Sequence, residues 1–357
     1  MSQEGTSGAD AMSTNFSRIT LHASRFTQRC KPLLVVVGPT AVGKSRLAIA
    51  LARALGTEIL TADSRQVYRG MDIGTDKPGP AERQGIPHRL IDLVDPDQPF
   101  NVGLYRRYAL AEIDRLHRDG QVPLVVGGTG LYVRALLRGL WSGPSADWLY
   151  RARLEEEAAH RGLEYLHREL VRVDPESAGR LHPRDKAKII RALEVYHLLG
   201  RPLSEAHRRH AFAETAFSAC VIGLTRERSE LYRRIEARVE EELAKGLVDE
   251  TRHLLEKGYG RALGSMKGLG YRQIAGYLAG DDDYDEAVRR LKRDTRRYAK
   301  RQLTWFRQEP GIIWLTIEED ESPEPVVARI LDQVERFLSQ LDMHLEADTR
   351  TGHKLTG

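Results

Sequence analysis

A glycine-rich turn carries the clearest chemistry in the chain. The segment GPTAVGKS follows the spacing G-x-x-x-x-G-K-[ST] and lies between an apolar run and an amphipathic stretch that ends at Leu55. Backbone amides in such a turn form a nest for anions, the lysine adds a mobile positive charge, and the serine hydroxyl can reach a magnesium ion. We therefore predict a phosphate site made by Gly38, Pro39, Thr40, Ala41, Val42, Gly43, Lys44 and Ser45.

Asp63 is a second candidate for chemistry. It directly follows the apolar run from Glu58 to Ala62, which is typical of a short buried strand. In open α/β sheets ligands bind at the carboxyl ends of the strands, so this carboxylate is expected beside the phosphate loop, where it can act as a base. A turn or helix cap made by Asp63 or Ser64 is the alternative interpretation.

The acidic residue that most kinases and ATPases with this loop place after another core strand is missing here. Such enzymes use it to hold magnesium through water. The run from Val122 to Val126 is followed by glycines and Thr129, and Asp92 and Asp95 fit the pattern poorly. A routine ATPase is therefore disfavoured. A GTPase is disfavoured too, because the guanine-reading N-K-x-D motif is absent from the sequence.

Short apolar runs alternate with helix-period stretches along the chain. Strands are predicted at Leu33–Val37, Glu58–Ala62, Val122–Val126, Ala219–Leu224 and Ile312–Leu315. Helices are predicted at Lys44–Leu55, Leu104–Arg118, Arg226–Ala244, Val248–Glu256 and Tyr284–Arg307. This alternation predicts an α/β fold with a P-loop three-layer core and a mostly parallel sheet.

The strand pattern stops between residues 146 and 212, where helical stretches dominate. We predict a helical insertion there, within a discontinuous core made of residues 31–145 and 213–342. Additional covering helices of a single domain are the alternative. Residues 1–30 and 343–357 are polar and aperiodic, which predicts disordered tails. The first of these segments also has a composition that suits an organelle transit peptide.

Composition limits the classes of protein that remain. The sequence has no run of roughly 18 apolar residues, so no membrane span or membrane partner is expected. Its cysteines, Cys30 and Cys220, are too few for a disulfide framework and suit a reducing, cytoplasmic location. The net charge is +4 and the sequence pI is about 9.0. These values make a local basic patch worth seeking.

One such patch lies between Ala287 and Arg307. Its basic residues far outnumber its one acid, and they fall at helical spacings that suit tracking of nucleic-acid phosphates: Arg289, Arg293, Arg297, Lys300 and Arg301. A solvated surface helix is the alternative. Trp305 and Phe306, near the end of the same stretch, are expected in the core.

An ordered set of motifs gives the chain a specific resemblance. It resembles the tRNA dimethylallyltransferases, a family of isopentenyl transferases, over about residues 33–316. The phosphate loop alone is unspecific, but the whole set is not. The motifs that carry the resemblance are GPTAVGKS, ADSRQVYRGMDIGTDKP, PHRLIDLVDP, VPLVVGGTGLYVRALL, KGLGYRQI and AKRQLTWFR.

The resemblance implies a transferase whose loop holds the diphosphate of dimethylallyl diphosphate. The exocyclic N6 amine of the adenine just 3′ of the tRNA anticodon would attack the allylic carbon, and diphosphate would leave. Asp63 matches the family's general base, and Thr40 matches a loop threonine near the reacting groups. Lys44 and a Mg²⁺ ion bound through Ser45 would stabilise the leaving group. The adenine must leave its stack, which costs roughly a few kcal/mol.

The family also implies contacts with the anticodon stem-loop of tRNA. Arg272 is left open between tRNA and the diphosphate. The isoleucines before Arg191 depart from the polar run that relatives often carry. The alternative interpretation of Arg151 and Lys188 is that they are ordinary solvent-exposed residues of helices. The implied contacts are Asp63, Ser64, Arg65, Gln66, Thr129, Arg151, Ala187, Lys188, Ile189, Ile190, Arg191, Lys267, Gly268, Leu269, Gly270, Tyr271 and Arg272.

Two rival functions remain at this point. A transferase that prenylates free adenine nucleotides shares the phosphate loop and the region around Asp63 but needs no extensive RNA surface. A small-molecule kinase becomes the better interpretation only if the later motifs are fortuitous. The expected partners are tRNA and dimethylallyl diphosphate, with the chain as a monomer.

Overall fold

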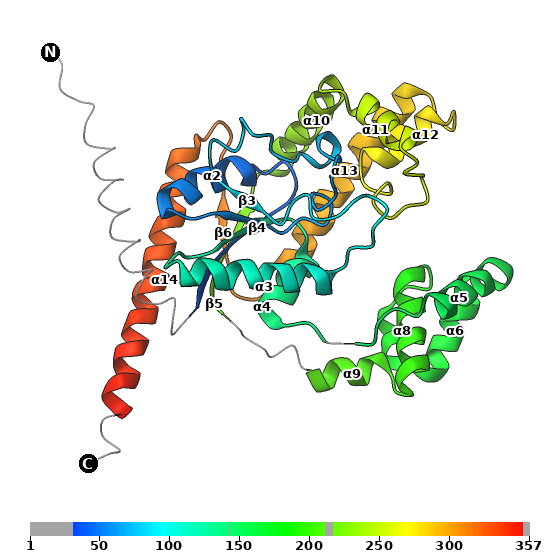
Figure 1. The fold of residues 1–357 in the computed structure, drawn as a ribbon, viewed down its shortest axis with the longest axis horizontal. Coiled ribbons are helices and arrows are strands. Elements are labelled where there is room, and N and C mark those ends of the chain that lie inside the picture. The colour runs from blue at the N-terminus through cyan, green and yellow to red at the C-terminus, as the bar shows by residue number, and fades with distance from the viewer. Residues whose placement is uncertain (1–30, 142, 211–216, 353–357) are drawn as a thin grey trace. The chain divides into compact units, whose positions relative to one another are not determined.

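The computed structural model describes residues 31–141, 143–210 and 217–352 (Figure 1). The predicted tail or transit peptide at residues 1–30, which includes Cys30, lies outside them. Within the described residues six strands form one parallel sheet in the order β3-β2-β4-β1-β5-β6. They are β1 (Pro32–Val37), β2 (Ile59–Thr61), β3 (His88–Arg89), β4 (Leu124–Gly127), β5 (Ser218–Thr225) and β6 (Ile312–Thr316).

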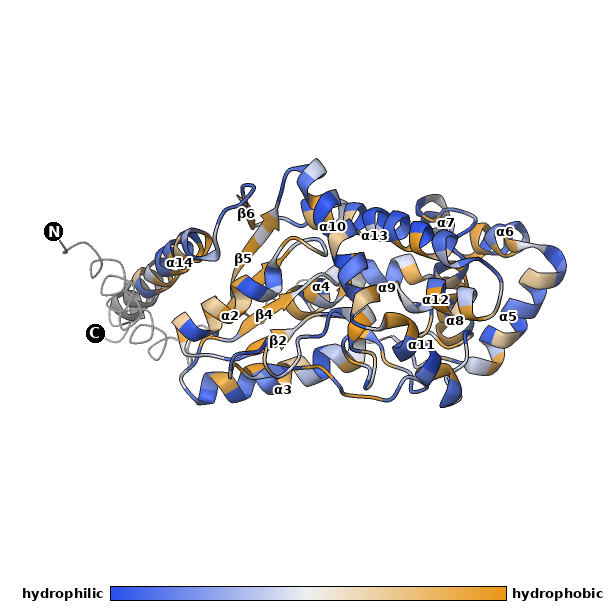
Figure 2. Ribbon diagram, turned by 90° about the horizontal axis from the view of Figure 1, so that it is seen from above, coloured by the Kyte–Doolittle hydropathy of each residue, from blue (hydrophilic) through white to orange (hydrophobic). Residues whose placement is uncertain are grey.

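Alternating side chains of β1 face opposite layers of helices. Leu34 and Val36 pack in a cluster with α2 (Lys44–Leu55) and α14 (Pro323–Gly352), whereas Leu33 and Val35 pack with α3 (Val102–Arg118) and α4 (Gly130–Arg138) on the other face. Figure 2 shows the central strands as hydrophobic and the covering helices as mixed. This arrangement confirms the predicted three-layer α/β fold. The helices of this part are α2 (Lys44–Leu55), α3 (Val102–Arg118), α4 (Gly130–Arg138), α10 (Arg228–Ala244), α11 (Leu247–Glu256), α12 (Tyr271–Leu278), α13 (Tyr284–Arg307) and α14 (Pro323–Gly352).

A third apolar cluster joins the loop after β2 to α11 and α12. Val67 and Met71, from the loop after β2, pack against Leu247 of α11 and Tyr271 of α12. The short 3₁₀ helix η1 (Ile73–Thr75) lies in this loop. Tyr271 is fully buried, and its hydroxyl donates to Glu250 at 2.6 Å. Glu250 in turn accepts from the backbone amide of Ile73 at 2.9 Å, so the loop after β2 is tied to α11.

Residues Arg138–Thr215 form a compact unit separate from Met1–Leu137 and Ala216–Gly357. Its helices are α5 (Trp148–Arg161), α6 (Leu163–Val173), α7 (Pro175–Arg180), α8 (Lys186–Leu199) and α9 (Leu203–His210). Leu154, Leu166 and Ile189 lie in its apolar centre. The expected insertion at residues 146–212 lies within this unit, and its predicted contact with tRNA stays a prediction.

The carboxyl-terminal segment differs from its prediction as a tail. Helix α14 continues to Gly352, past the expected boundary at Met343, and only residues 353–357 of that tail lie outside the described part. Val326, Ile330 and Val334 recur at helical spacing and are buried in the apolar cluster that also contains the buried side chains of α2. A helix that is nucleated by such packing extends at little cost through good helix formers such as Leu, Glu and Ala. No described helix is both long and apolar enough to cross a membrane.

Candidate active site

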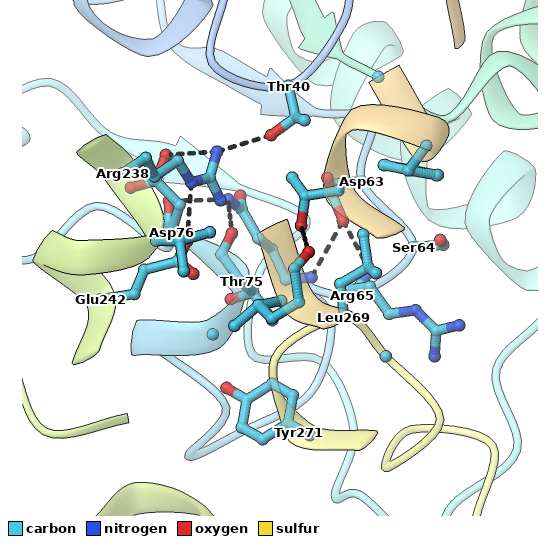
Figure 3. Close-up of a pocket in the computed structure, with 18 of the residues that line it drawn as sticks. Thr40, Asp63, Ser64, Arg65, Thr75, Asp76, Arg238, Glu242, Leu269 and Tyr271 are labelled. Carbon is cyan, nitrogen blue, oxygen red and sulfur yellow. Dashed lines mark hydrogen bonds and ion pairs between the residues drawn. The ribbon is translucent and has the colours of Figure 1, made fainter. Parts of the chain in front are cut away.

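A cavity lies at the edge of the sheet where the parallel strands end. Because β1, β2, β4 and β5 are parallel, the residues that follow them lie at the same edge of the sheet. These are the phosphate loop, Asp63, the Gly128–Thr129 turn and Arg226. The loop, Asp63 and Gly128 line a cavity of about 360 Å³ together with residues of α10, α12 and α13 (Figure 3).

The phosphate loop requires glycine at its first position. Gly38 has φ +153°, and a Cβ atom there would lie 2.7 Å from the Leu224 carbonyl oxygen, so a side chain is excluded. Outside the loop, Arg226 Nε donates to the Val42 carbonyl at 3.0 Å and Arg234 Nε donates to the Ala41 carbonyl at 2.9 Å. These arginines, one directly after β5 and the other on α10, hold the loop in shape.

Gln302 joins the phosphate loop to the turn after β4. Its Oε1 accepts from the Thr40 amide at 2.9 Å, and its Nε2 donates to the Gly128 carbonyl at 2.9 Å. Gln302 is buried on α13. The sequence motif AKRQLTWFR contains this residue, but its role as a strut depends on contacts across more than 170 residues of chain.

Lys44 is poised to receive an anion. Its Nζ donates to the backbone carbonyls of Gly38 at 3.0 Å and Pro39 at 2.7 Å and pairs with no carboxylate within 4.0 Å among the described residues. Burial, and then nearby Arg238, lower the pKa of Lys44 to about 8 against the opposing effects of Asp63 and Asp76. A diphosphate that binds here would therefore supply the negative charge that stabilises the protonated form of Lys44.

The two carboxylate oxygens of Asp63 differ in their hydrogen bonds. Oδ1 accepts from the backbone amides of Arg65 at 2.7 Å and Gln66 at 3.4 Å, which is the turn cap considered as an alternative (Figure 3). Oδ2 accepts no hydrogen bond from the part of the chain that the structure describes. Asp63 lines the cavity, so the cap fixes the side chain and leaves an oxygen available for a proton.

Arg238 is a site residue that sequence reasoning missed. From α10 its Nη1 donates to Thr40 Oγ1 at 2.7 Å and lies 3.2 Å from an Asp76 oxygen, and its Nε donates to Glu242 at 2.7 Å (Figure 3). Asp76 belongs to the quoted motif after β2, but α10 carries several arginines and no motif distinguishes Arg238. Only the packing of α10 against the sheet edge identifies it.

The segment from Lys267 to Arg272 forms another wall of the cavity. Lys267, Gly268, Leu269, Tyr271 and Arg272 line it beside Asp63–Gln66, whereas Gly270 does not. Thr129 Oγ1 accepts from the Ser64 amide at 3.0 Å. The structure thus brings together the expected contacts of the core: Asp63, Ser64, Arg65, Gln66, Thr129 and the segment from residue 267 to residue 272.

Arg272 forms an ion pair with an acidic residue of α13. Its Nη2 donates to Asp294 at 2.9 Å, and its side chain is about half exposed at the cavity. The neighbouring Gln273 donates to the same carboxylate at 3.1 Å. These contacts orient Arg272 and leave its role between the diphosphate and tRNA a prediction.

Within the helical unit, Arg151 and Arg191 converge on buried Glu194. Arg151 makes a bidentate pair with it at 2.7 and 2.8 Å, and Arg191 Nη1 donates to the same carboxylate. Ile189 and Ile190 are buried in the unit's centre, so their side chains are not the surface contacts that the family pattern implied. Their burial is the packing consequence of an apolar pair on α8, whose neighbour Lys188 is exposed.

The basic stretch of α13 is only partly available for phosphates. Arg289 pairs with Glu286 and Arg293 pairs with Asp294, so carboxylates already engage these two arginines in the first half of the helix. Lys300 and Arg301, farther along, are exposed and have no carboxylate partner among the described residues. Phe306 is buried, as expected, and partly buried Trp305 packs beside the same cluster.

Asp92, Asp95 and the thiol of Cys220 do not take part in the phosphate site. Asp92 lies 2.6 Å from Lys77, and Asp95 lies 3.1 Å from Arg69, so neither is offered to the loop. Burial raises the pKa of Cys220 to about 11, which keeps this thiol protonated at neutral pH. The described residues contain no cluster of three or more His, Cys, Asp or Glu side chains that could hold a metal ion.

The donor set around Ser45 fits magnesium carried by a phosphorylated substrate. Ser45 and Asp63 line the same cavity beside Lys44. Magnesium prefers oxygen ligands and usually binds through few protein groups, with the rest of its shell supplied by phosphates and water. A hydroxyl and one nearby carboxylate, with no all-protein cage in the described part, match that pattern.

Family models match two overlapping parts of the chain. The model described as IPP transferase matches residues 66–309, and the model described as isopentenyl transferase matches residues 31–95. The chain is 53% identical over 287 residues to tRNA dimethylallyltransferase 2 of Geotalea uraniireducens, with 80% of this chain and 93% of that one covered. It is 51% identical over 300 residues to tRNA dimethylallyltransferase of Syntrophobacter fumaroxidans, with 84% and 87% covered.

Solved structures resemble the chain over most of its length. The tRNA isopentenylpyrophosphate transferase of Bacillus halodurans is 38% identical, with a TM-score of 0.67 and coverage of 88% of this chain and 99% of that one. A eukaryotic dimethylallyltransferase described as acting on tRNA is 26% identical, with a TM-score of 0.68 and coverage of 90% and 80%.

Proposed function

We propose, from the premise that the chain belongs to the IPP transferase family, that its cavity joins dimethylallyl diphosphate to an adenine of tRNA. The chain is an enzyme that transfers a dimethylallyl group to tRNA. The finer proposal is that the donor is dimethylallyl diphosphate and that the acceptor is N6 of the adenine 3′ to the anticodon. The observation that carries it is the meeting of the phosphate loop and Asp63 at one cavity.

The proposed reaction forms one carbon–nitrogen bond and breaks one carbon–oxygen bond. The adenine N6 attacks the allylic carbon of the donor, and the electrons of the broken bond leave with the diphosphate. The proton lost by the amine goes to Asp63, whose Oδ2 is unoccupied by any described donor. An exocyclic adenine amine is a weak base, so a positioned acceptor assists this step.

The leaving diphosphate gains charge as the bond breaks, and the loop side of the cavity is arranged to stabilise it. Loop amides, Lys44 and Arg238 would bind its oxygens, while the Thr40 hydroxyl, held by Arg238, would lie beside the reacting groups. Ser45 would hold Mg²⁺ while Asp63 stays available as the base, and this ion when bound would neutralise part of the developing charge.

We propose that tRNA is bound by the opposite wall and by basic helices. Arg65, Gln66, Lys267 and Arg272 line the cavity and can contact the anticodon loop. Exposed Lys300 and Arg301 offer phosphate contacts from α13. In the helical unit the proposed contacts are Arg151, Ala187, Lys188 and Arg191. We also propose a cytoplasmic location, because tRNA is the substrate and the cysteine usage fits a reducing compartment. The proposed state of the chain is a monomer.

The test is transfer of label from dimethylallyl diphosphate carrying a radioactive dimethylallyl group. Purified chain is incubated with this donor and either tRNA, AMP or ATP, and the product is digested to nucleosides. We expect label at N6 of the adenosine 3′ to the anticodon and on neither free nucleotide. Label on AMP or ATP with none on tRNA would instead support a transferase of free nucleotides.

A further inference from the structure

Arg238 is held by acidic residues whose freedom to move differs sharply. Glu242, one turn along α10, accepts from Arg238 Nε at 2.7 Å, and its side chain is only 10% exposed. Asp76, in the loop after β2, lies 3.2 Å from Arg238 Nη1, and its side chain is 48% exposed. Burial favours a lower pKa for Arg238, but the two acids more than offset it and raise that pKa, so Arg238 stays charged.

The backbone of Asp76 is fixed even though its side chain is half exposed. Its φ of +51° lies in the left-handed region, its amide donates to the Ile73 carbonyl at 3.0 Å, and its carbonyl accepts from Gln66 Nε2 at 3.0 Å. The carboxylate therefore leaves or returns by side-chain rotation alone. A second cavity of about 340 Å³ is also lined by Asp76, Arg238 and Glu242, and it offers room for that rotation.

We propose that Asp76 occupies on Arg238 the place that a diphosphate oxygen takes, and that Glu242 is a positioning residue that keeps the guanidinium aimed at Thr40 during the exchange. This inference rests on the proposed function, because it assumes that the anion in the cavity is a diphosphate. Glu242 can stay on Nε because it contacts Arg238 away from the atoms that face the loop. Asp76 then competes with the donor for entry and with the product diphosphate for release.

The competition follows from charge. Without an anion, Asp76 pairs with Nη1 of the partly buried guanidinium, while Glu242 pairs with Nε, so both sides of Arg238 have an acidic partner. When diphosphate binds, Asp76 faces a like charge and must withdraw, so part of the binding free energy is spent on displacing it. A site with Asp76 therefore binds diphosphate more weakly and releases it faster than the same site without this carboxylate.

The test compares binding of inorganic diphosphate, by calorimetry with Mg²⁺, in wild type and in Asp76→Asn. Asparagine tolerates the left-handed conformation and keeps the side-chain shape. We expect Asp76→Asn to bind diphosphate at least about tenfold more tightly and to be inhibited more strongly by this product. Glu241→Gln is the matched control, because Glu241 lines the second cavity and pairs with Lys245 without touching Arg238. It should change the affinity far less.

The positioning role of Glu242 is tested by a pair of variants. Glu242→Ala should weaken diphosphate binding and raise KM for the donor, whereas Glu242→Gln, which keeps an acceptor for Nε, should restore most of both. Equal diphosphate affinity in wild type and Asp76→Asn would overturn the exchange while leaving the proposed function intact. Failure of wild type to bind diphosphate at all would overturn both, and loss of affinity in Glu242→Gln equal to that in Glu242→Ala would overturn the positioning role.

Discussion

Lys44 and Asp63 show how single side chains are prepared at this site. Lys44 donates to loop carbonyls and, within the described ranges, to no carboxylate, so its charge is compensated only weakly. Asp63 uses one oxygen for a backbone cap and keeps the other unengaged by described donors. Both arrangements hold a reactive group in place without using up the interaction that catalysis needs.

The lowered pKa of Lys44 gives a prediction about proton uptake. Because this pKa is about 8 without an anion and an adjacent diphosphate favours the charged form, binding should raise it. At a pH about one unit above that value, diphosphate binding should therefore take up a proton. Calorimetry in buffers of different ionisation enthalpy measures this uptake.

Lys44→Arg is the control for this prediction, because arginine stays charged at every accessible pH. Its proton uptake should be smaller than that of wild type by up to one proton, and this difference removes the contribution of the diphosphate's own titration. The same uptake in both proteins would mean that Lys44 is already charged before the anion arrives.

The helices differ in how far the sequence determines them. The predicted bounds of α2 and α13 agree with the structure, because each has a strong apolar period and clear ends: Gly43 and Gly56 flank α2, and Asp283 caps α13. The apolar pattern did not predict β3, α4, α12 or α14. Strand β3 has two residues, and α4 and α12 begin directly after glycine-rich turns that were interpreted only as motifs.

The candidate site was predictable where one segment makes it and not where distant segments meet. The phosphate loop and Asp63 each follow a strand within a local motif. Arg238 and Gln302 reach the loop from helices far along the chain, and their neighbours in sequence include many similar polar residues. Their roles depend on how α10 and α13 pack, which periodicity alone does not specify.

The second half of α13 should contribute to tRNA binding more than the first. Lys300→Ala with Arg301→Ala removes exposed cations that have no carboxylate partner among the described residues, so fewer counterions are released on binding. The slope of log affinity against log salt should become shallower by about 1.5. Filter binding of tRNA across a salt series measures it.

Arg289→Ala with Arg290→Ala is the matched control for this helix, because it removes the same charge from residues paired with Glu286 and Asp282. Its slope should stay close to wild type. A control slope that changes as much as that of the Lys300 and Arg301 variant would show that net charge alone, and not the position on α13, governs binding.

The chain combines two compact units that should respond separately to damage. Glu194 is completely buried and joins Arg151 to Arg191 inside the helical unit. Glu194→Ala removes an acceptor from both arginines, which are only partly exposed, and should destabilise that unit by about 2 kcal/mol or more. Hydrogen exchange in α5 and α8 should quicken, tRNA affinity should fall, and diphosphate affinity should stay the same.

Glu157→Ala is the control in the same unit, since Glu157 pairs with exposed Arg153, and a pair with an exposed partner contributes about 1 kcal/mol or less. It should leave exchange in α8 near its wild-type rate. A fall in diphosphate affinity in Glu194→Ala would contradict the separate behaviour of the two units.

The central claim is that Asp63 accepts the proton of the adenine amine at the cavity where the diphosphate departs. Asp63→Asn keeps an oxygen for the caps to Arg65 and Gln66 and removes the basic carboxylate. The most direct measurement is single-turnover transfer to an anticodon stem-loop, with binding of RNA and of diphosphate measured separately. We expect both to bind normally and the transfer rate to fall roughly 100- to 10,000-fold. A wild-type transfer rate in Asp63→Asn would contradict the account.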